Sequence, residues 1–198
     1  MVDALTACHS TIHHRSLMNS LPVCPAPPVI RVALDTDVDE IVRVTNLAFL
    51  AEAFCVRGDR TDATDIRNRF ASGMFFVIDD PANLGVGSRL LASVYCAIIN
   101  GRGYLGLISV DAKAQGLGLS RLLVVAVEQR CRDAGCSFID ITVVNLREEL
   151  FAFYAKFGFV ACDVLPFPLP ERALQPLLLV KMTKPLRSPV QLALPAAR

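Results

Sequence analysis

The segment from residue 110 to 123, VDAKAQGLGLSRLL, constrains the fold most strongly, because it sets two glycines between an apolar run and an apolar helix. Glycine weakens a helix, so Gly116 and Gly118 indicate a backbone conformation or a close approach that a Cβ would prevent. A helix start also offers unpaired N–H groups and the positive end of the helix dipole, which favour an anion. The segment predicts a strand, a loop and a helix. The loop is either a phosphate site or simply a tight connection.

Two well-known nucleotide loops do not fit this segment. A dinucleotide-binding fold needs Gly-x-Gly-x-x-Gly after its first strand, whereas here the third glycine is missing and the loop follows the fourth predicted strand. A P-loop needs Gly-Lys-Ser/Thr, which is also absent. If the loop binds a phosphate, it belongs to another class of fold.

The chain around this loop alternates between strand and helix patterns. Apolar runs bounded by turn residues predict seven strands, at residues 29–34, 74–79, 89–99, 104–110, 138–144, 159–164 and 177–183. Apolar residues at helical spacing predict four helices, at residues 35–54, 61–73, 116–134 and 146–157. Such a series builds an α/β fold, a mixed sheet with helices on its faces.

Length and charge limit the organisation and the partners. The 198 residues favour a single domain over residues 29–184, with a poorly ordered leader at 1–28 and a tail at 185–198. The net charge of +1, from 20 basic and 19 acidic residues, gives no electrostatic reason to expect nucleic acid or a membrane surface as partner. No apolar run approaches the roughly 20 residues of a membrane span.

The cysteines and histidines predict neither disulfides nor a metal site. Seven cysteines are scattered without a Cys-x-x-Cys pair: Cys8, Cys24, Cys55, Cys96, Cys131, Cys136 and Cys162. We interpret them as small buried hydrophobic residues in a reducing compartment, which favours the cytoplasm. All three histidines, His9, His13 and His14, lie in the leader, where no other residue completes a metal site.

Two motifs carry a resemblance to the GNAT N-acetyltransferase superfamily. The loop from Gln115 to Ser120, QGLGLS, resembles that family's Gln/Arg-x-x-Gly-x-Gly/Ala loop, with Ser120 as a departure at the small final position. The segment FYAKFGF, which contains Tyr154, resembles the family's Tyr-x-x-x-Gly-Phe segment. The likeness covers roughly residues 29 to 184. It implies a central mixed, mostly antiparallel, twisted sheet of about six or seven strands flanked by about four helices.

The resemblance also implies an acetyl-CoA site and no metal. Backbone N–H groups of the loop would hold the pyrophosphate, from residues Gln115, Gly116, Leu117, Gly118, Leu119 and Ser120. The pantetheine arm would pair with the edge of the fourth strand at Ile108, Ser109 and Val110, where the fourth and fifth strands splay apart in this family. The N–H near Val110 would stabilise an oxyanion, and Asn145 would contact the cofactor.

Tyr154 matches the family tyrosine that protonates the departing thiolate. A phenol with a pKa near 10 suits this role, because the thiol that forms is a similarly weak acid. The alternative is that Tyr154 only fills the core. It lies beside an apolar stripe with helical spacing, made of Leu146, Leu150, Phe153 and Phe157. That offset leaves room for its hydroxyl to face a cleft.

The general base and the acceptor site are less defined. Some family members use a glutamate on the fourth strand, but the strand at 104–110 has no acidic residue before Asp111. Glu52 in the first helical region, or an ordered water relay, would then remove the proton. Arg57 and Arg60, in a charged loop after that region, are candidates to bind a polar substrate; the alternative is a solvated loop.

These residues favour an N-acetyltransferase that moves an acetyl group from acetyl-CoA to a primary amine of a small molecule or a peptide. Direct attack is expected, because no cysteine lies beside an activating histidine. The alternative is a non-catalytic acyl-CoA-binding sensor or scaffold module. A homodimer is a possible state of assembly.

Overall fold

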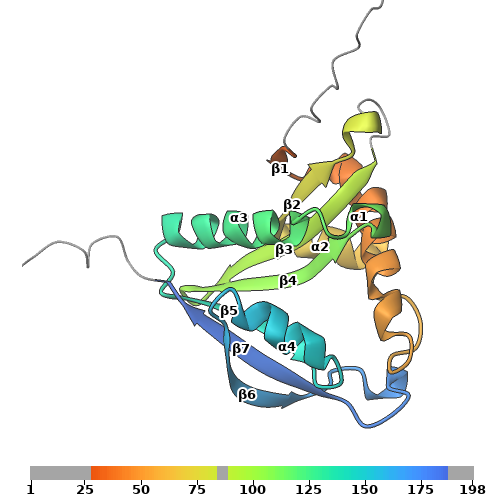
Figure 1. Cartoon of the computed structure of the whole chain (residues 1–198), viewed down its shortest axis with the longest axis vertical. Coiled ribbons are helices and arrows are strands. Elements are labelled where there is room, and N and C mark those ends of the chain that lie inside the picture. Colours follow the sequence, from red (N-terminus) through yellow and green to blue (C-terminus); the bar gives the residue numbers. More distant parts are fainter. Residues whose placement is uncertain (1–27, 84–88, 187–198) are drawn as a thin grey trace, which may run out of the picture.

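A seven-stranded sheet forms the centre of the computed structural model, which describes residues 28–83 and 89–186 (Figure 1). The strands follow the order β1 (Ile30–Val32), β2 (Gly73–Asp79), β3 (Leu90–Ile99), β4 (Arg102–Val110), β5 (Phe138–Val144), β7 (Leu178–Pro185) and β6 (Val160–Pro166). All neighbours are antiparallel except β4 and β5, which are parallel. The predicted mixed, mostly antiparallel sheet is confirmed. No helix in the described ranges is long and apolar enough to cross a membrane.

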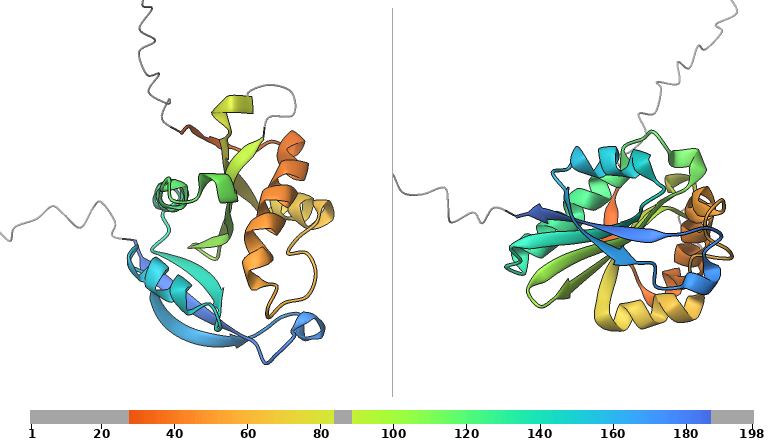
Figure 2. Two further views of the ribbon diagram at one scale, coloured as in Figure 1. Left: turned by 45° about the vertical axis from the view of Figure 1, so that its right-hand side comes forward. Right: turned by 90° about the horizontal axis from the view of Figure 1, so that it is seen from below.

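Helices cover both faces of this sheet (Figure 2). One face carries α1 (Val38–Phe49) and α2 (Ala63–Ser72), and the other carries α3 (Leu119–Asp133) and α4 (Glu148–Ala155). Successive side chains of a strand point to opposite faces, so each central strand supplies both cores. In β3, Tyr95 and Ala97 pack with α1 and α2, while Val94 and Cys96 pack with α3 and α4.

All four helices are shorter in the structure than predicted, and the limits of two of them have a clear physical reason. The helix predicted from residue 116 begins at Leu119, because Gly116 and Gly118 have φ angles of +81° and +76° and cannot continue a right-handed helix. The segment 35–54 is α1 flanked by two short 3₁₀ turns, η1 (Asp35–Asp37) and η2 (Leu50–Glu52). At the entry, the Asp37 carboxylate accepts the Leu34 N–H at 2.7 Å and tightens the turn.

The strands β4 and β5 separate after a short paired region. Their register contains only Gly103 opposite Ile139 and Tyr104 opposite Asp140. Further along β4 the pairing with β3 shifts between Ser93 and Tyr95. Within this bulge Leu107 has a φ of +48°, an uncommon value for a residue with a side chain. β5 instead pairs with β7 along its whole length, so the two parallel strands diverge into a V.

The cysteines agree with the expectation of burial except at one position. Cys55, Cys96, Cys131 and Cys136 are buried and free, but Cys162 is exposed. The prediction was wrong for Cys162 because it lies on β6, the last strand of the sheet, whose residues are almost all exposed. Cys8, Cys24 and the three histidines lie outside the described residues.

The described fold ends slightly later than the predicted domain. β7 includes Pro185, and the buried Leu186 donates its N–H to the Ser137 carbonyl at 2.8 Å. The remaining parts of the predicted leader and tail, residues 1–27 and 187–198, lie outside the described ranges.

Candidate functional site

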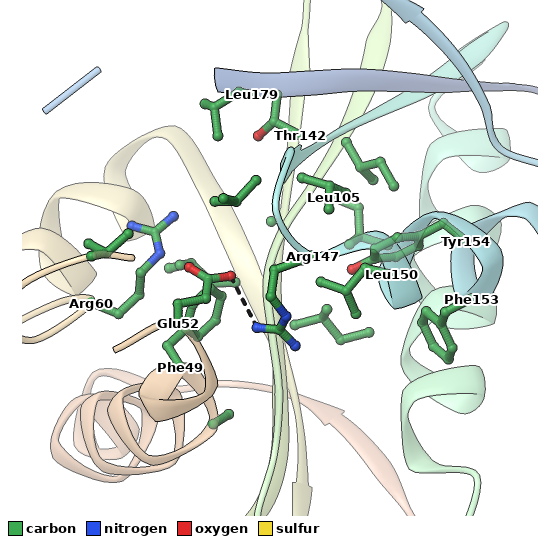
Figure 3. Close-up of a pocket in the computed structure, with 18 of the residues that line it drawn as sticks. Phe49, Glu52, Arg60, Leu105, Thr142, Arg147, Leu150, Phe153, Tyr154 and Leu179 are labelled. Atoms are coloured by element: carbon green, nitrogen blue, oxygen red, sulfur yellow. Dashed lines mark hydrogen bonds and ion pairs between the residues drawn. The ribbon is translucent and has the colours of Figure 1, made fainter. Parts of the chain in front are cut away.

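A cavity of about 480 Å³ fills the V between β4 and β5 (Figure 3). Its walls come from the end of α1, from β4 and β5, from α4, and from the loop between β6 and β7. Gln115 and Ser120 line it beside the start of α3, whereas Glu52 and Arg60 belong to the segment after α1. The site is therefore built from segments that lie far apart in the sequence.

The glycine loop at the α3 end of the cavity can hold an anion. A Cβ on Gly116 or Gly118 would meet no atom within 4 Å, so the space above both residues is open to a ligand. In the described part of the chain, the N–H groups of Gly116, Gly118, Leu119 and Ser120 have no acceptor. Unpaired N–H groups at a helix start are the donors that a phosphate requires.

An ion-pair network fixes the approach to this loop. Asp111 accepts the Lys113 N–H at 3.1 Å and pairs with Arg43 of α1 at 3.0 Å. These two contacts hold the pKa of Asp111 below its ordinary value. Arg43 also donates to the Leu90 carbonyl at the start of β3. The loop is thus anchored to two neighbouring elements and needs little ordering when an anion binds.

Beyond Tyr104, the edge of β4 that faces the cavity pairs with no other strand in the described part of the chain. Ile108 and Val110 line the cavity beyond the last residue of β4 that pairs with β5. Backbone groups on this edge can accept an added extended chain, as any free strand edge can. Ser109 is buried instead, and its hydroxyl donates to the Leu107 carbonyl at 3.0 Å inside the bulge. Its side chain therefore stabilises the bulge in β4 and does not line the cavity.

Tyr154 lies both in the core and on the cavity wall. It is only 6% exposed, and its ring packs edge-on against Phe153 and Phe159. In Figure 3 its hydroxyl points toward the cavity, where it has no hydrogen-bond partner among the described residues. Burial raises the pKa of Tyr154 above its ordinary value, so the phenol keeps its proton at neutral pH. The two interpretations of Tyr154 are therefore compatible.

Glu52 contributes a buried carboxylate to the same cavity. It is 8% exposed, and burial raises its pKa above the ordinary glutamate value. It forms a long ion pair with Arg147, whose Nη1 lies 3.5 Å from the Glu52 Oε1 (Figure 3). Arg147 itself binds Glu149 more closely, at 2.5 Å. Glu52 is therefore a weakly paired carboxylate with access to the cavity.

Sequence reasoning did not identify Arg147, which lines the cavity from the segment between β5 and α4. Its position at the start of a predicted helix, three residues after a predicted strand and at the end where the strands splay, was the available signal. Nothing local showed that it would meet Glu52, because 95 residues separate the two.

Several predicted site residues do not line this cavity: Ser109, the loop residues Gly116, Leu117, Gly118 and Leu119, and also Asn145 and Arg57. Asn145 does not line it: its side-chain oxygen accepts the Leu178 N–H at 2.9 Å and holds the ends of β5 and β7 together. Its predicted cofactor contact stays a prediction. Arg57 lines a smaller neighbouring cavity, whereas Arg60 lines both. Among the residues that the structure describes, no cluster of three His, Cys, Asp or Glu side chains could hold a metal ion.

Comparisons with known proteins show which sequences and structures this chain resembles. A sequence model described as "Acetyltransferase (GNAT) family" matches residues 44–159. The mycothiol acetyltransferase of Propionibacterium freudenreichii is 31% identical over 140 residues, which are 66% of this chain and 43% of that protein. The chain thus spans less than half the length of this curated relative.

Solved structures show the same fold. An N-acetyltransferase from Staphylococcus aureus Mu50 superposes with a TM-score of 0.63 at 16% identity, covering 82% of this chain and 100% of that one. Nourseothricin acetyltransferase gives a TM-score of 0.61 at 16% identity, covering 81% and 99%. At these identities the likeness concerns the fold alone.

Proposed function

Because the chain belongs to the GNAT acetyltransferase family, we propose that it transfers an acetyl group from acetyl-CoA to a primary amine by direct attack. The observation that carries the proposal is the presence of Glu52 and Tyr154 in one cavity. Both are buried, both line the same cavity, and they come from opposite walls of it. A proton acceptor and a proton donor on two sides of one cleft suit acyl transfer to an amine.

Separate features in and beside the cavity would hold the parts of acetyl-CoA. The free N–H groups at Gly116, Gly118, Leu119 and Ser120 would hold the pyrophosphate. The free edge of β4 near Ile108 would pair with the pantetheine amides. Bound in this way, acetyl-CoA would supply a thioester whose carbonyl carbon is the electrophile.

Glu52 would act as the base. An amine reaches the cleft mainly as an ammonium ion and must lose a proton before it attacks. A carboxylate with a raised pKa accepts that proton more readily than an exposed glutamate. Glu52 would thus take the place of the acidic group that β4 lacks. A water relay from Glu52 to the amine would use the same group.

Tyr154 would donate a hydrogen bond to the sulfur that leaves. Its raised pKa makes complete proton transfer less favourable than for an ordinary phenol. A fixed O–H donor still stabilises negative charge as it develops, and its effect is greatest in a site that excludes water. None of the described cysteines lines the cavity, which supports direct attack over an acyl-cysteine intermediate.

The glycine loop gives a first prediction. Gly118→Ala places a methyl group in the open space above the loop, so the Kd for acetyl-CoA should rise at least tenfold. A ligand at about 100 times its Kd stabilises a fold by about 2.7 kcal/mol, and a tenfold weaker Kd roughly halves that gain. Calorimetry and thermal shift measure both effects.

Gly101→Ala is the matched control for this variant. Gly101 has a φ of +73° and an equally open Cβ position, but it lies in the turn between β3 and β4. Both variants carry the same left-handed strain of about 1–2 kcal/mol. Equal acetyl-CoA affinity in the two variants would contradict a phosphate site at Gly118.

The proposed function predicts thiol release that depends on an amine. The protein, acetyl-CoA and a panel of primary amines should release CoA thiol only when an acceptor is present, with one acetylated product per thiol by mass spectrometry. Acetyl-CoA binding without any amine-dependent thiol release would instead indicate the non-catalytic binding module.

A further inference from the structure

We propose that the acceptor is a small molecule that carries an anionic group, such as a carboxylate, close to its amine, and that Arg60 binds this group. The inference rests on the proposed acetyl transfer and assigns the substrate class of the same site. It follows from three observations at the end of the cavity formed by Glu52 and Arg60.

The first observation is that Arg60 has no anionic partner among the residues that the structure describes. Three arginines line the cavity, and two of them are engaged: Arg147 pairs with Glu52 and Glu149, and Arg172 donates to the carbonyls of Arg57 and Asp59. The Arg60 guanidinium lies 5.0 Å from the centre of the Phe49 ring. It makes no hydrogen bond or ion pair within the described part of the chain. Its planar set of donors matches a carboxylate.

The second observation is that Arg60 and Glu52 carry opposite charges at one end of the cavity (Figure 3). They are near enough for Arg60 to favour the ionised form of Glu52, but they form no ion pair. An acceptor with only an ammonium group would bring a positive charge to Glu52 and leave it close to Arg60. An acceptor with a second, anionic group satisfies both side chains and removes this repulsion.

The third observation concerns the size of the acceptor. The segment after α1 and the loop between β6 and β7 lie side by side, as Figures 1 and 2 both show. Backbone hydrogen bonds join them from Arg57 to Arg172 at 2.8 Å and from Leu174 to Cys55 at 2.9 Å. The two Arg172 side-chain bonds to Arg57 and Asp59 reinforce this connection. We name these four hydrogen bonds the clasp.

The clasp joins the two walls that flank Arg60, so it favours a compact acceptor over a polypeptide chain. The space beside Arg60 is large enough for a compact acceptor. A second cavity of about 350 Å³ shares Phe49, Glu52, Val56 and Arg60 with the main cavity. Volumes of this order suit a small molecule.

The test compares matched acceptors that differ in one charge. The α-amino acids, their carboxamides and the corresponding decarboxylated amines are offered with saturating acetyl-CoA. For the preferred side chain, kcat/KM should be about 10- to 100-fold higher for the acid than for the amide, the range expected for a charge-assisted hydrogen bond. Arg60→Gln should remove this preference by slowing only the acid, and Arg60→Lys should retain part of it. The KM for acetyl-CoA should not change.

Arg67→Gln is the control, because Arg67 is an exposed arginine of α2 that lines neither cavity. Amides or simple amines that react as well as the acids would overturn the inference and leave acetyl transfer intact. Efficient acetylation of long peptides would overturn the small-acceptor part. A second measurement needs no turnover: with CoA present, the N-acetylated acid should bind more tightly than its amide, and only when Arg60 is intact. Equal affinities would refute the anion site even if the proposed transfer itself failed.

Discussion

Glu52→Gln is expected to lower kcat/KM for the amine acceptor by about 10²–10⁴, the range for loss of a general base. The amide keeps the size of the side chain but cannot take the proton of the incoming ammonium. Acetyl-CoA affinity should change little, because Glu52 belongs to the segment after α1 and contributes nothing to the glycine loop. Initial rates of thiol release, measured over a range of concentrations of both substrates, give this loss of kcat/KM.

The pH profile separates a base from a merely structural carboxylate. Burial raises the pKa of Glu52 above its ordinary value of 4.5, so the carboxylate form is lost as pH falls through that raised value. As the pH is lowered, wild-type kcat/KM should therefore begin to fall at a higher pH than it would with an exposed glutamate as the base. The pH profile of Glu52→Gln should lack this acidic decline. The raised pKa also means that the charge costs stability at neutral pH, so the variant should not melt at a lower temperature.

Glu149→Gln is the control for Glu52. It removes the other carboxylate that binds Arg147, but its side chain is 64% exposed and lies outside the cavity. Its activity should remain within about threefold of the wild type, as expected for an exposed ion pair. If Glu52→Gln retained wild-type rates with chemistry rate-limiting, the base would have to be water without help from Glu52.

Tyr154→Phe is expected to lower kcat by about 10²–10³, the cost of removing one fixed donor from a site of developing negative charge. The ring and its contacts with Phe153 and Phe159 remain, so stability and acetyl-CoA binding should be nearly unchanged. The loss should appear in both kcat and kcat/KM, because the hydrogen bond strengthens only as charge collects on sulfur. An acyl donor with a less basic thiolate should partly restore the rate.

The corresponding control is Tyr95→Phe. Tyr95 is also buried, but it packs with α1 and α2, and its hydroxyl lies 2.9 Å from the Ser72 Oγ. This variant loses a hydrogen bond away from the cavity and should cost about 1 kcal/mol of stability without slowing transfer. Equal rates for Tyr154→Phe and Tyr95→Phe would assign Tyr154 to packing alone.

The sequence predicted local structure well because local structure depends on neighbouring residues. Apolar spacing identified seven strands and four helices, and the sheet contains all seven. The glycines indicated an unusual backbone before α3, and both have positive φ angles. The predicted helix nevertheless starts three residues too early. The pattern of apolar side chains contains no information about the φ angles of the residues before it.

The side chains that meet in the cavity were harder to predict, since their positions depend on how distant elements pack. Asn145 and Arg147 lie two residues apart after β5, yet Asn145 binds Leu178 while Arg147 reaches the cavity and Glu52. The strand pattern alone does not show which of these two side chains points into the cavity. The turn after β5 and the pairing of β5 with β7 decide them.

The sequence by itself determined the order of the elements, the glycine loop before α3 and the family, because these depend on short patterns of apolar residues and glycine. Only the tertiary structure decided which charges share the cavity. Glu52 and Arg147 are 95 residues apart, and Arg172 binds the Asp59 carbonyl across 113 residues. The splay of β4 and β5 opens the space between such segments, and the clasp closes one side of it. A lone charge in a sequence is usually solvated, and it becomes a candidate site residue when packing removes water and brings another charge beside it.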